Sequence, residues 1–289
     1  MHTLRTLWGA CHPGPTLVVT ALSTGLGLAV GLSAWRLLLL AAVIFAGQVS
    51  IGLSNDARDA ARDQAVGRTD KPLAQPGAPV RLAWGIAVTL LLAAIAGTLP
   101  LGWGAALAHA VLLASGWAYN LWLKSTVWSA ACFALAFGGL PSIVFLARPA
   151  QAAAESIAAG PGLAPVWATL AGAALGVAIH FSNVLPDFEA DRLTGVRGLP
   201  HRLGARVSAL VVATSLAAGA ASVAVATARV APGALAWVTW AGALAVVGLA
   251  AWAWISTRTR GATRLGFRLV MAAAAVLVAQ AGLAGALGA

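Results

Sequence analysis

The chain has 289 residues, of which 60% are apolar and only 9% are charged, and its formal net charge is +10. A soluble domain carries charge on about a quarter of its residues, so this composition excludes a water-soluble globule, a disordered chain and a disulfide-rich secreted protein. Runs of about 20 apolar residues instead predict a polytopic membrane protein that crosses the bilayer as helices.

Nine apolar segments follow one another along the chain, several of them bounded by Pro or Gly. They cover residues 15–33, 37–54, 82–99, 103–122, 127–146, 165–185, 206–227, 232–255 and 268–287. We therefore predict an all-α fold of nine transmembrane helices that forms a single domain over residues 1–289.

The basic residues predict the orientation of these helices. With nine spans, all of the 18 Lys and Arg residues fall on one side except Arg36, Arg148 and Arg229. Positive residues mark the cytoplasmic side of a membrane protein, so the amino terminus is predicted to be cytoplasmic in a multi-pass cell-membrane protein. The net charge is then a topology signal and an attraction to anionic membrane lipid, and it predicts no nucleic acid partner.

Seven of the eight acidic residues gather in two clusters on the predicted cytoplasmic side. The first cluster, after the second segment, contains Asp56, Asp59, Asp63 and Asp70. The second, after the sixth segment, contains Asp187, Glu189 and Asp191, and the remaining acid is Glu155 on the opposite side. These acids could simply balance the charge of nearby arginines in solvated loops, but their spacing favours a site.

If the second helix continues through its cluster, Asp56, Asp59 and Asp63 share one narrow stripe of its surface. Asp187 and Asp191 also share a face, with Asn183 one turn earlier. Carboxylates packed this closely repel one another unless a cation neutralises them, and oxygen ligands of this kind suit Mg²⁺. The predicted metal ligands are Asp56, Asp59, Asp63, Asp187 and Asp191.

Basic residues lie among these acids. Arg58 and Arg62 alternate with the acids and are expected to pair with them, whereas Arg68, Lys71 and Arg197 are predicted to bind phosphate. Acids that hold Mg²⁺ beside bases that hold phosphate describe a site for a diphosphate.

At this point the residues resemble a known family. The run from Asn55 to Asp63 matches the Asn-Asp-x-x-Asp-x-x-x-Asp motif of the UbiA superfamily of intramembrane prenyltransferases, and the run from Asp187 to Asp191 resembles its second motif, Asp-x-x-x-Asp. Tyr119 and Lys124 resemble the Tyr and Lys that these proteins carry at the end of their fourth helix. One departure is Val184, where many members have a further acid, so that Asn183 is expected to contribute in its place.

The resemblance implies a helical bundle around a central cavity that opens to the cytoplasm. It also implies transfer of a prenyl group from an isoprenyl diphosphate, bound through Mg²⁺, to an aromatic or lipophilic acceptor. In this picture Asp56, Asp59, Asp63, Asp187, Asp191, Tyr119 and Lys124 are catalytic. The diphosphate is bound by Asn55, Arg68, Lys71, Lys124, Asn183 and Arg197.

Two further groups of side chains have open roles. The 12 tryptophans, among them Trp117 and Trp122, offer aromatic faces for a carbocation, although Trp is also common in interfacial belts. His109 and His180 lie inside apolar segments, His180 being the better functional candidate, while His12 and His201 are expected at the level of the lipid headgroups.

Two alternative functions stay open. A membrane terpene cyclase on the same scaffold would ionise the diphosphate in the same way and use no acceptor. A proton- or ion-coupled transporter would place its acids near the bilayer midplane, whereas the acids here lie at helix ends.

Overall fold

The computed structural model describes residues 2–149, 162–193, 195–230, 233–260 and 264–288, so that Glu155 lies outside the described residues. Regular structure in the described residues is entirely helical, which confirms the all-α class. The long helices are α2 (Pro13–Ala29), α3 (Ala34–Ala65), α4 (Val80–Thr98), α5 (Trp103–Leu121), α6 (Ser129–Leu146), α8 (Val166–Val184), α10 (Leu199–Val230), α11 (Ala234–Arg260) and α12 (Arg264–Gly288). Each coincides, in order, with one predicted apolar segment.

The length and apolar character of these helices fit a membrane protein. In the described part of the chain, six helices are long and apolar enough to cross a bilayer: α3, α4, α6, α8, α10 and α11. Large apolar side chains such as Leu38, Leu107 and Leu244 point outward and are exposed, as expected for a surface that faces lipid. The crossing of the membrane by all nine helices stays a prediction.

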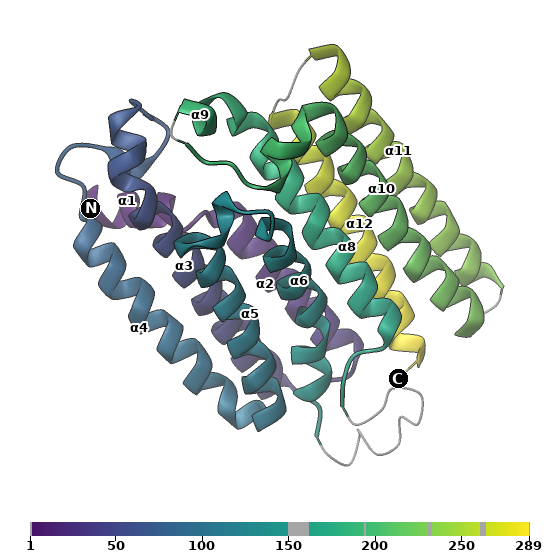
Figure 1. Cartoon of the computed structure of the whole chain (residues 1–289). Helices are drawn as coiled ribbons and strands as arrows, with labels where there is room; N and C mark the ends of the chain where they lie inside the picture. Colours follow the sequence, from purple (N-terminus) through teal and green to yellow (C-terminus); the bar gives the residue numbers. More distant parts are fainter. Residues whose placement is uncertain (1, 150–161, 194, 231–232, 261–263, 289) are drawn as a thin grey trace.

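Six helices form a closed ring. α3 packs between α2 and α5, α6 between α5 and α8, and α12 closes the ring by packing against both α8 and α2. α4 lies outside against α3, while α10 and α11 pack outside against α8 and α12 (Figure 1). The ring, rather than all nine helices, therefore surrounds the centre of the molecule.

Three of the short elements lie at one end of the bundle. α1 (His2–Ala10), the 3₁₀ turn η1 (Pro72–Ala74) and α9 (Phe188–Leu193) all lie at the end where α3 and α8 finish (Figure 1). The segments that carry the two acid clusters consequently meet at the same end.

Close packing of α8 against α6 depends on two glycines one turn apart. A Cβ added at Gly172 would collide with the carbonyl oxygen of Phe137, and one added at Gly176 would collide with that of Phe133. Small residues at such spacing let helix backbones approach closely in membranes. This contact sets the position of α8, and with it that of the second acid cluster.

We expect Gly172→Ala to destabilise the protein by about 2 kcal/mol, because the added methyl group meets backbone atoms that cannot rotate away. Gly139→Ala in α6 is the matched control, since nothing lies within 4 Å of a Cβ at that position. Thermal unfolding in detergent measures both variants. Equal melting temperatures for the two would show that this helix contact is loose.

Candidate active site

Three of the four acids of the first cluster lie on one unbroken helix. α3 continues 11 residues beyond the predicted apolar segment, to Ala65, so that Asp56, Asp59 and Asp63 share one helical stripe as predicted. All three carboxylates are buried, with 2%, 8% and 3% of their residue surface exposed. Three buried acids on one helix need positive partners.

One arginine side chain, that of Arg68, contacts acids of both clusters. α8 ends at Val184, and the short elements η4 (Leu185–Asp187) and α9 carry Asp187 and Asp191. The guanidinium of Arg68 lies 3.3 Å from Asp187 and donates two hydrogen bonds, of 2.8 and 3.0 Å, to the carboxylate of Asp70. The loop after α3 and the loop after α8 are thereby tied together.

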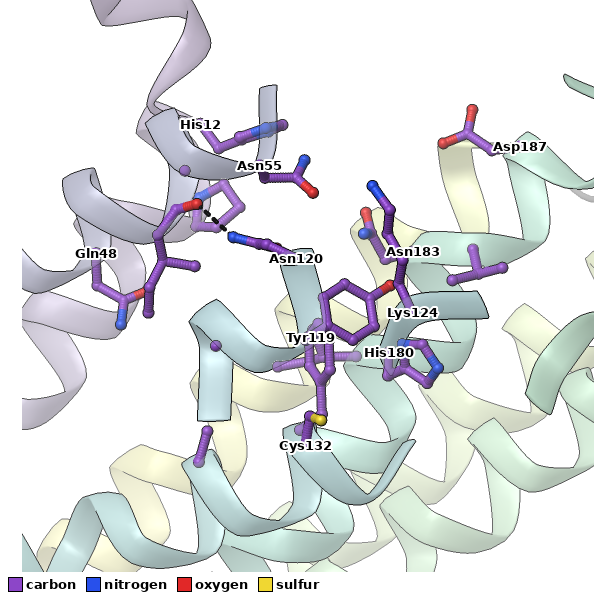
Figure 2. Close-up of a pocket in the computed structure, with 18 of the residues that line it drawn as sticks. His12, Gln48, Asn55, Tyr119, Asn120, Lys124, Cys132, His180, Asn183 and Asp187 are labelled. Carbon is purple, nitrogen blue, oxygen red and sulfur yellow. Dashed lines mark hydrogen bonds between the residues drawn. The ribbon is translucent and has the colours of Figure 1, made fainter. Parts of the chain in front are cut away.

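Two acids from each cluster line one cavity of about 290 Å³. Its wall comes from the six ring helices, from the loops and short elements at their ends, and from the start of α10. The predicted site residues that line it are Asn55, Asp59, Asp63, Arg68, Lys71, Tyr119, Lys124, Asn183, Asp187 and Asp191. Figure 2 shows Asn55 on one side of the space and Asp187 on the other, with Tyr119, Lys124 and Asn183 between them.

Two predicted residues lie outside the cavity wall. Arg197 is exposed and does not belong to the lining, so the structure does not bring it to the other predicted phosphate ligands. Asp56 is buried behind the wall and is also absent from the lining. Val184, which replaces an acid of the family pattern, is buried and lines the cavity.

Each carboxylate of the site is matched by a basic or imidazole side chain. Lys124 pairs with Asp59, and Arg62 lies 2.9 Å from Asp59 and 3.3 Å from Asp63. Within the described residues, no group of three or more His, Cys, Asp or Glu side chains is close enough to share a metal ion. Lys124 and Arg62 contact the carboxylate oxygens that a divalent cation would bind.

Outside the membrane-spanning segments, Asp70 and Lys124 have pKa values that are shifted by their surroundings. A hydrogen bond from Arg68 lowers the pKa of Asp70 to about 2, so that this acid stays ionised and keeps the guanidinium in place. Burial lowers the pKa of the Lys124 amine, while the neighbouring Asp59 opposes this effect. Arg68 and Lys124 thus provide positive charge at opposite acid clusters.

Histidines supply contacts that the sequence interpretation missed. His12 lies 2.9 Å from Asp56, although 44 residues separate them, and His201 lies 3.1 Å from Asp191. Both histidines also line the cavity, while their place at the headgroups stays a prediction. The sequence carries no signal for these contacts, because no spacing links either histidine to its acidic partner.

The part of the cavity wall away from the acids is aromatic. His180 donates to or accepts from the Ser129 hydroxyl at 3.0 Å, and its ring meets Tyr119 edge-on at 5.5 Å between centroids. Phe133 contacts both rings, at 5.0 and 4.8 Å. The predicted aromatic candidates lie elsewhere: Trp117 donates to Ser50 from outside the lining, and Trp122 is exposed.

Comparison with known proteins places this arrangement in context. No curated protein sequence matches the chain. Solved structures do: one reported for digeranylgeranylglyceryl phosphate synthase in membranes is 12% identical, with 99% of each chain covered and a TM-score of 0.72. A UbiA homologue from Aeropyrum pernix K1 is 20% identical over 93% of this chain and 97% of its own, with a TM-score of 0.71.

A third structure, a UbiA homologue from Archaeoglobus fulgidus bound to GPP and Mg²⁺, is 16% identical over 97% of this chain and 99% of its own, with a TM-score of 0.69. At these identities the likeness establishes a shared fold. The sequence model of the UbiA prenyltransferase family matches residues 15–276, which is most of the chain. Together with the two acid motifs that meet at one cavity, this match shows that the chain belongs to the UbiA prenyltransferase family.

Proposed function

We propose that the protein catalyses Mg²⁺-dependent transfer of a prenyl group from an isoprenyl diphosphate to an aromatic or lipophilic acceptor within the membrane. One observation carries this proposal: acids from two helix ends and the bases Arg68, Lys71 and Lys124 line the same cavity. The chemistry needs that combination, because breaking the allylic C–O bond leaves a cation and a highly charged diphosphate.

The chemical type of the donors along the cavity suits Mg²⁺. Asp59, Asp63, Asp187 and Asp191 offer carboxylate oxygens from two directions, and hard oxygen ligands of this kind are those that Mg²⁺ prefers. Bound there, Mg²⁺ would neutralise part of the charge on the diphosphate. Lys124, which pairs with Asp59, and Arg68, which lies beside Asp187, would then be free to bind the phosphate oxygens.

Solved structures of homologues support an isoprenyl diphosphate as the prenyl donor. Archaeoglobus fulgidus UbiA homologues are described as bound to GPP and Mg²⁺ and to DMAPP and Mg²⁺, and both are isoprenyl diphosphates. We extend this substrate class, and the requirement for Mg²⁺, to the present chain.

The aromatic part of the wall suits the prenyl cation. Tyr119, Phe133 and His180 contact one another and line the cavity, and aromatic faces stabilise a nearby cation. Figure 2 shows the Tyr119 hydroxyl directed toward Lys124 and Asn183, at the boundary between the aromatic and the charged part. This boundary is where we place the breaking C–O bond.

Mass spectrometry of reaction products tests the proposed function. Membranes that contain the protein receive geranyl diphosphate, with and without a lipid extract as a source of acceptors. A product that carries a geranyl group and appears only with the extract supports transfer. A hydrocarbon or terpene alcohol formed without the extract would support the cyclase instead, and no consumption of geranyl diphosphate would contradict both.

The transporter interpretation has less support. The acids of a transporter are expected near the bilayer midplane, whereas the acid clusters lie at one end of the bundle, beside α1 and α9 (Figure 1).

We propose a single catalytic domain over residues 1–289 in the cell membrane, with nine spans, a cytoplasmic amino terminus and a cavity that opens to the cytoplasm.

Cysteine labelling tests this topology. In a variant without Cys11 and Cys132, single cysteines placed in the segments 66–79 and 188–198 are expected to react only with reagents that reach the cytoplasm, because positive residues concentrate there. Trp103 is exposed and begins α5, at the end of this helix that is away from Lys124. A cysteine at this position is expected to react only with reagents on the other side of the membrane. Labelling of all three from one side would overturn the nine-span arrangement.

A further inference from the structure

Asp56 differs from the other acids of the first motif in what surrounds it. Its Oδ1 atom accepts hydrogen bonds from His12 at 2.9 Å and from Lys71 at 2.8 Å, and Asn55 lies 3.4 Å away. Only 2% of the residue is exposed, and it does not line the cavity. Its two main partners, His12 and Lys71, do line the cavity, so the carboxylate lies behind the side chains that it binds.

A tight corner of the chain holds His12 at this place. His12 joins α1 to α2 with a left-handed backbone, φ 54°, and in the described chain no other residue except glycine has a positive φ. The following residue is Pro13, which further disfavours such a conformation. A strained conformation persists only where the surroundings impose it, and the hydrogen bond to Asp56 is one such constraint.

A glycine in helix α3 allows the corner at His12 to pack closely against this helix. Gly52 lies one turn before Asp56, and a Cβ added there would lie 2.5 Å from the carbonyl oxygen of Cys11. The Thr16 hydroxyl donates to the same carbonyl at 2.8 Å. The glycine therefore lets the corner lie directly against α3 and brings the imidazole of His12 within reach of Asp56.

We propose that Asp56 and His12 form a positioning pair: together they orient Lys71 toward the diphosphate, and Asp56, behind the cavity wall, is not itself a metal ligand. This departs from the metal role expected for Asp56 in the motif, and it rests on the proposed function. The remaining oxygen, Oδ2, is buried without a partner among the described residues. In the competing interpretation, Asp56 binds the metal ion through this Oδ2 atom. The experiment below distinguishes a metal ligand from a positioning residue.

Separate binding measurements on the detergent-solubilised protein provide the test. Mn²⁺, measured by electron paramagnetic resonance in the presence of geranyl diphosphate, reports on the metal ligands. Equilibrium dialysis with radiolabelled geranyl diphosphate at saturating Mn²⁺ reports on the binding of geranyl diphosphate. Asp59→Asn is expected to weaken Mn²⁺ binding at least tenfold, whereas Asp56→Asn and His12→Asn change it by less than about twofold and weaken geranyl diphosphate about tenfold, as expected for the loss of a charge-assisted contact.

Two further variants separate positioning from a general loss of structure. His12→Gln places an amide N–H near the position of the imidazole donor and is expected to restore most of the affinity for geranyl diphosphate. Lys71→Met combined with His12→Asn is expected to bind it no more weakly than Lys71→Met alone, because both changes act through one partner. Additive losses, or no recovery with His12→Gln, would contradict the positioning role.

The outcomes also distinguish this inference from the proposed function. If the wild-type protein binds neither Mn²⁺ nor geranyl diphosphate, the proposed function fails. If it binds both and Asp56→Asn weakens Mn²⁺ as strongly as Asp59→Asn does, the function stands and Asp56 is a metal ligand.

Discussion

Replacing Asp59 or Asp191 with asparagine is expected to lower the rate of prenyl transfer by about 10³-fold, because each change removes a charged oxygen ligand where the leaving diphosphate develops its charge. The two residues come from different helix ends and line the same cavity. Similar losses in both variants therefore indicate one shared centre. Transfer of the geranyl group under saturating Mg²⁺ is the measurement.

Matched controls lie next to these acids. Glu189 lies two residues from Asp187 and from Asp191, is exposed, and pairs with Arg192 in solvent. Glu189→Gln is expected to keep the rate within about twofold, since an exposed pair contributes little. Full activity in the Asp59 or the Asp191 variant would disprove a common metal site, and a large loss in Glu189→Gln would show that any change in these loops is harmful.

Removal of divalent cations is expected to abolish transfer and to weaken the binding of geranyl diphosphate. Without a metal ion, the acids hold their bases, as Asp59 holds Lys124 and Asp187 lies beside Arg68. Lys124 and Arg68 are then unavailable to the phosphate oxygens. The carboxylates that have no metal ion to neutralise them also repel the negatively charged diphosphate. The loss of transfer and the weaker binding of geranyl diphosphate therefore have the same cause.

Chelation with EDTA, followed by addition of excess Mg²⁺, measures this dependence. The rate is expected to fall to that of membranes without the protein and to recover on addition of Mg²⁺, with binding of geranyl diphosphate following the same course. Thermal unfolding in EDTA serves as the control for loss of structure. Undiminished transfer in EDTA would contradict a metal role for the acids.

Local features of the chain could be predicted because they depend on neighbours in the sequence. The nine apolar segments coincide with nine helices in the described residues, since the length and polarity of each segment determine it. The continuation of α3 through Asp56, Asp59 and Asp63 also follows from spacing, because the helical period places them in one stripe. Two acid motifs in one membrane chain were enough to suggest the family.

The tertiary structure decided which of these residues face the cavity. Helical periodicity indicates that Asp56 and Asp63 share a side of α3, but the α1–α2 corner covers Asp56 and leaves Asp63 at the wall. Similarly, the loop after α9 leaves Arg197 in solvent, while the start of α10 brings His201 to Asp191.

The sequence by itself therefore determined the helices, their order and the type of chemistry that the acid motifs allow, because each of these depends on residues a few positions apart. The pairing of each acid with its base, the entry of His12 into the site and the ring of six helices depend on the folded chain. The physical reason is that a helical period specifies which side chains share a face, whereas packing between distant helices, permitted by close approaches at Gly52 and Gly172, specifies what that face meets.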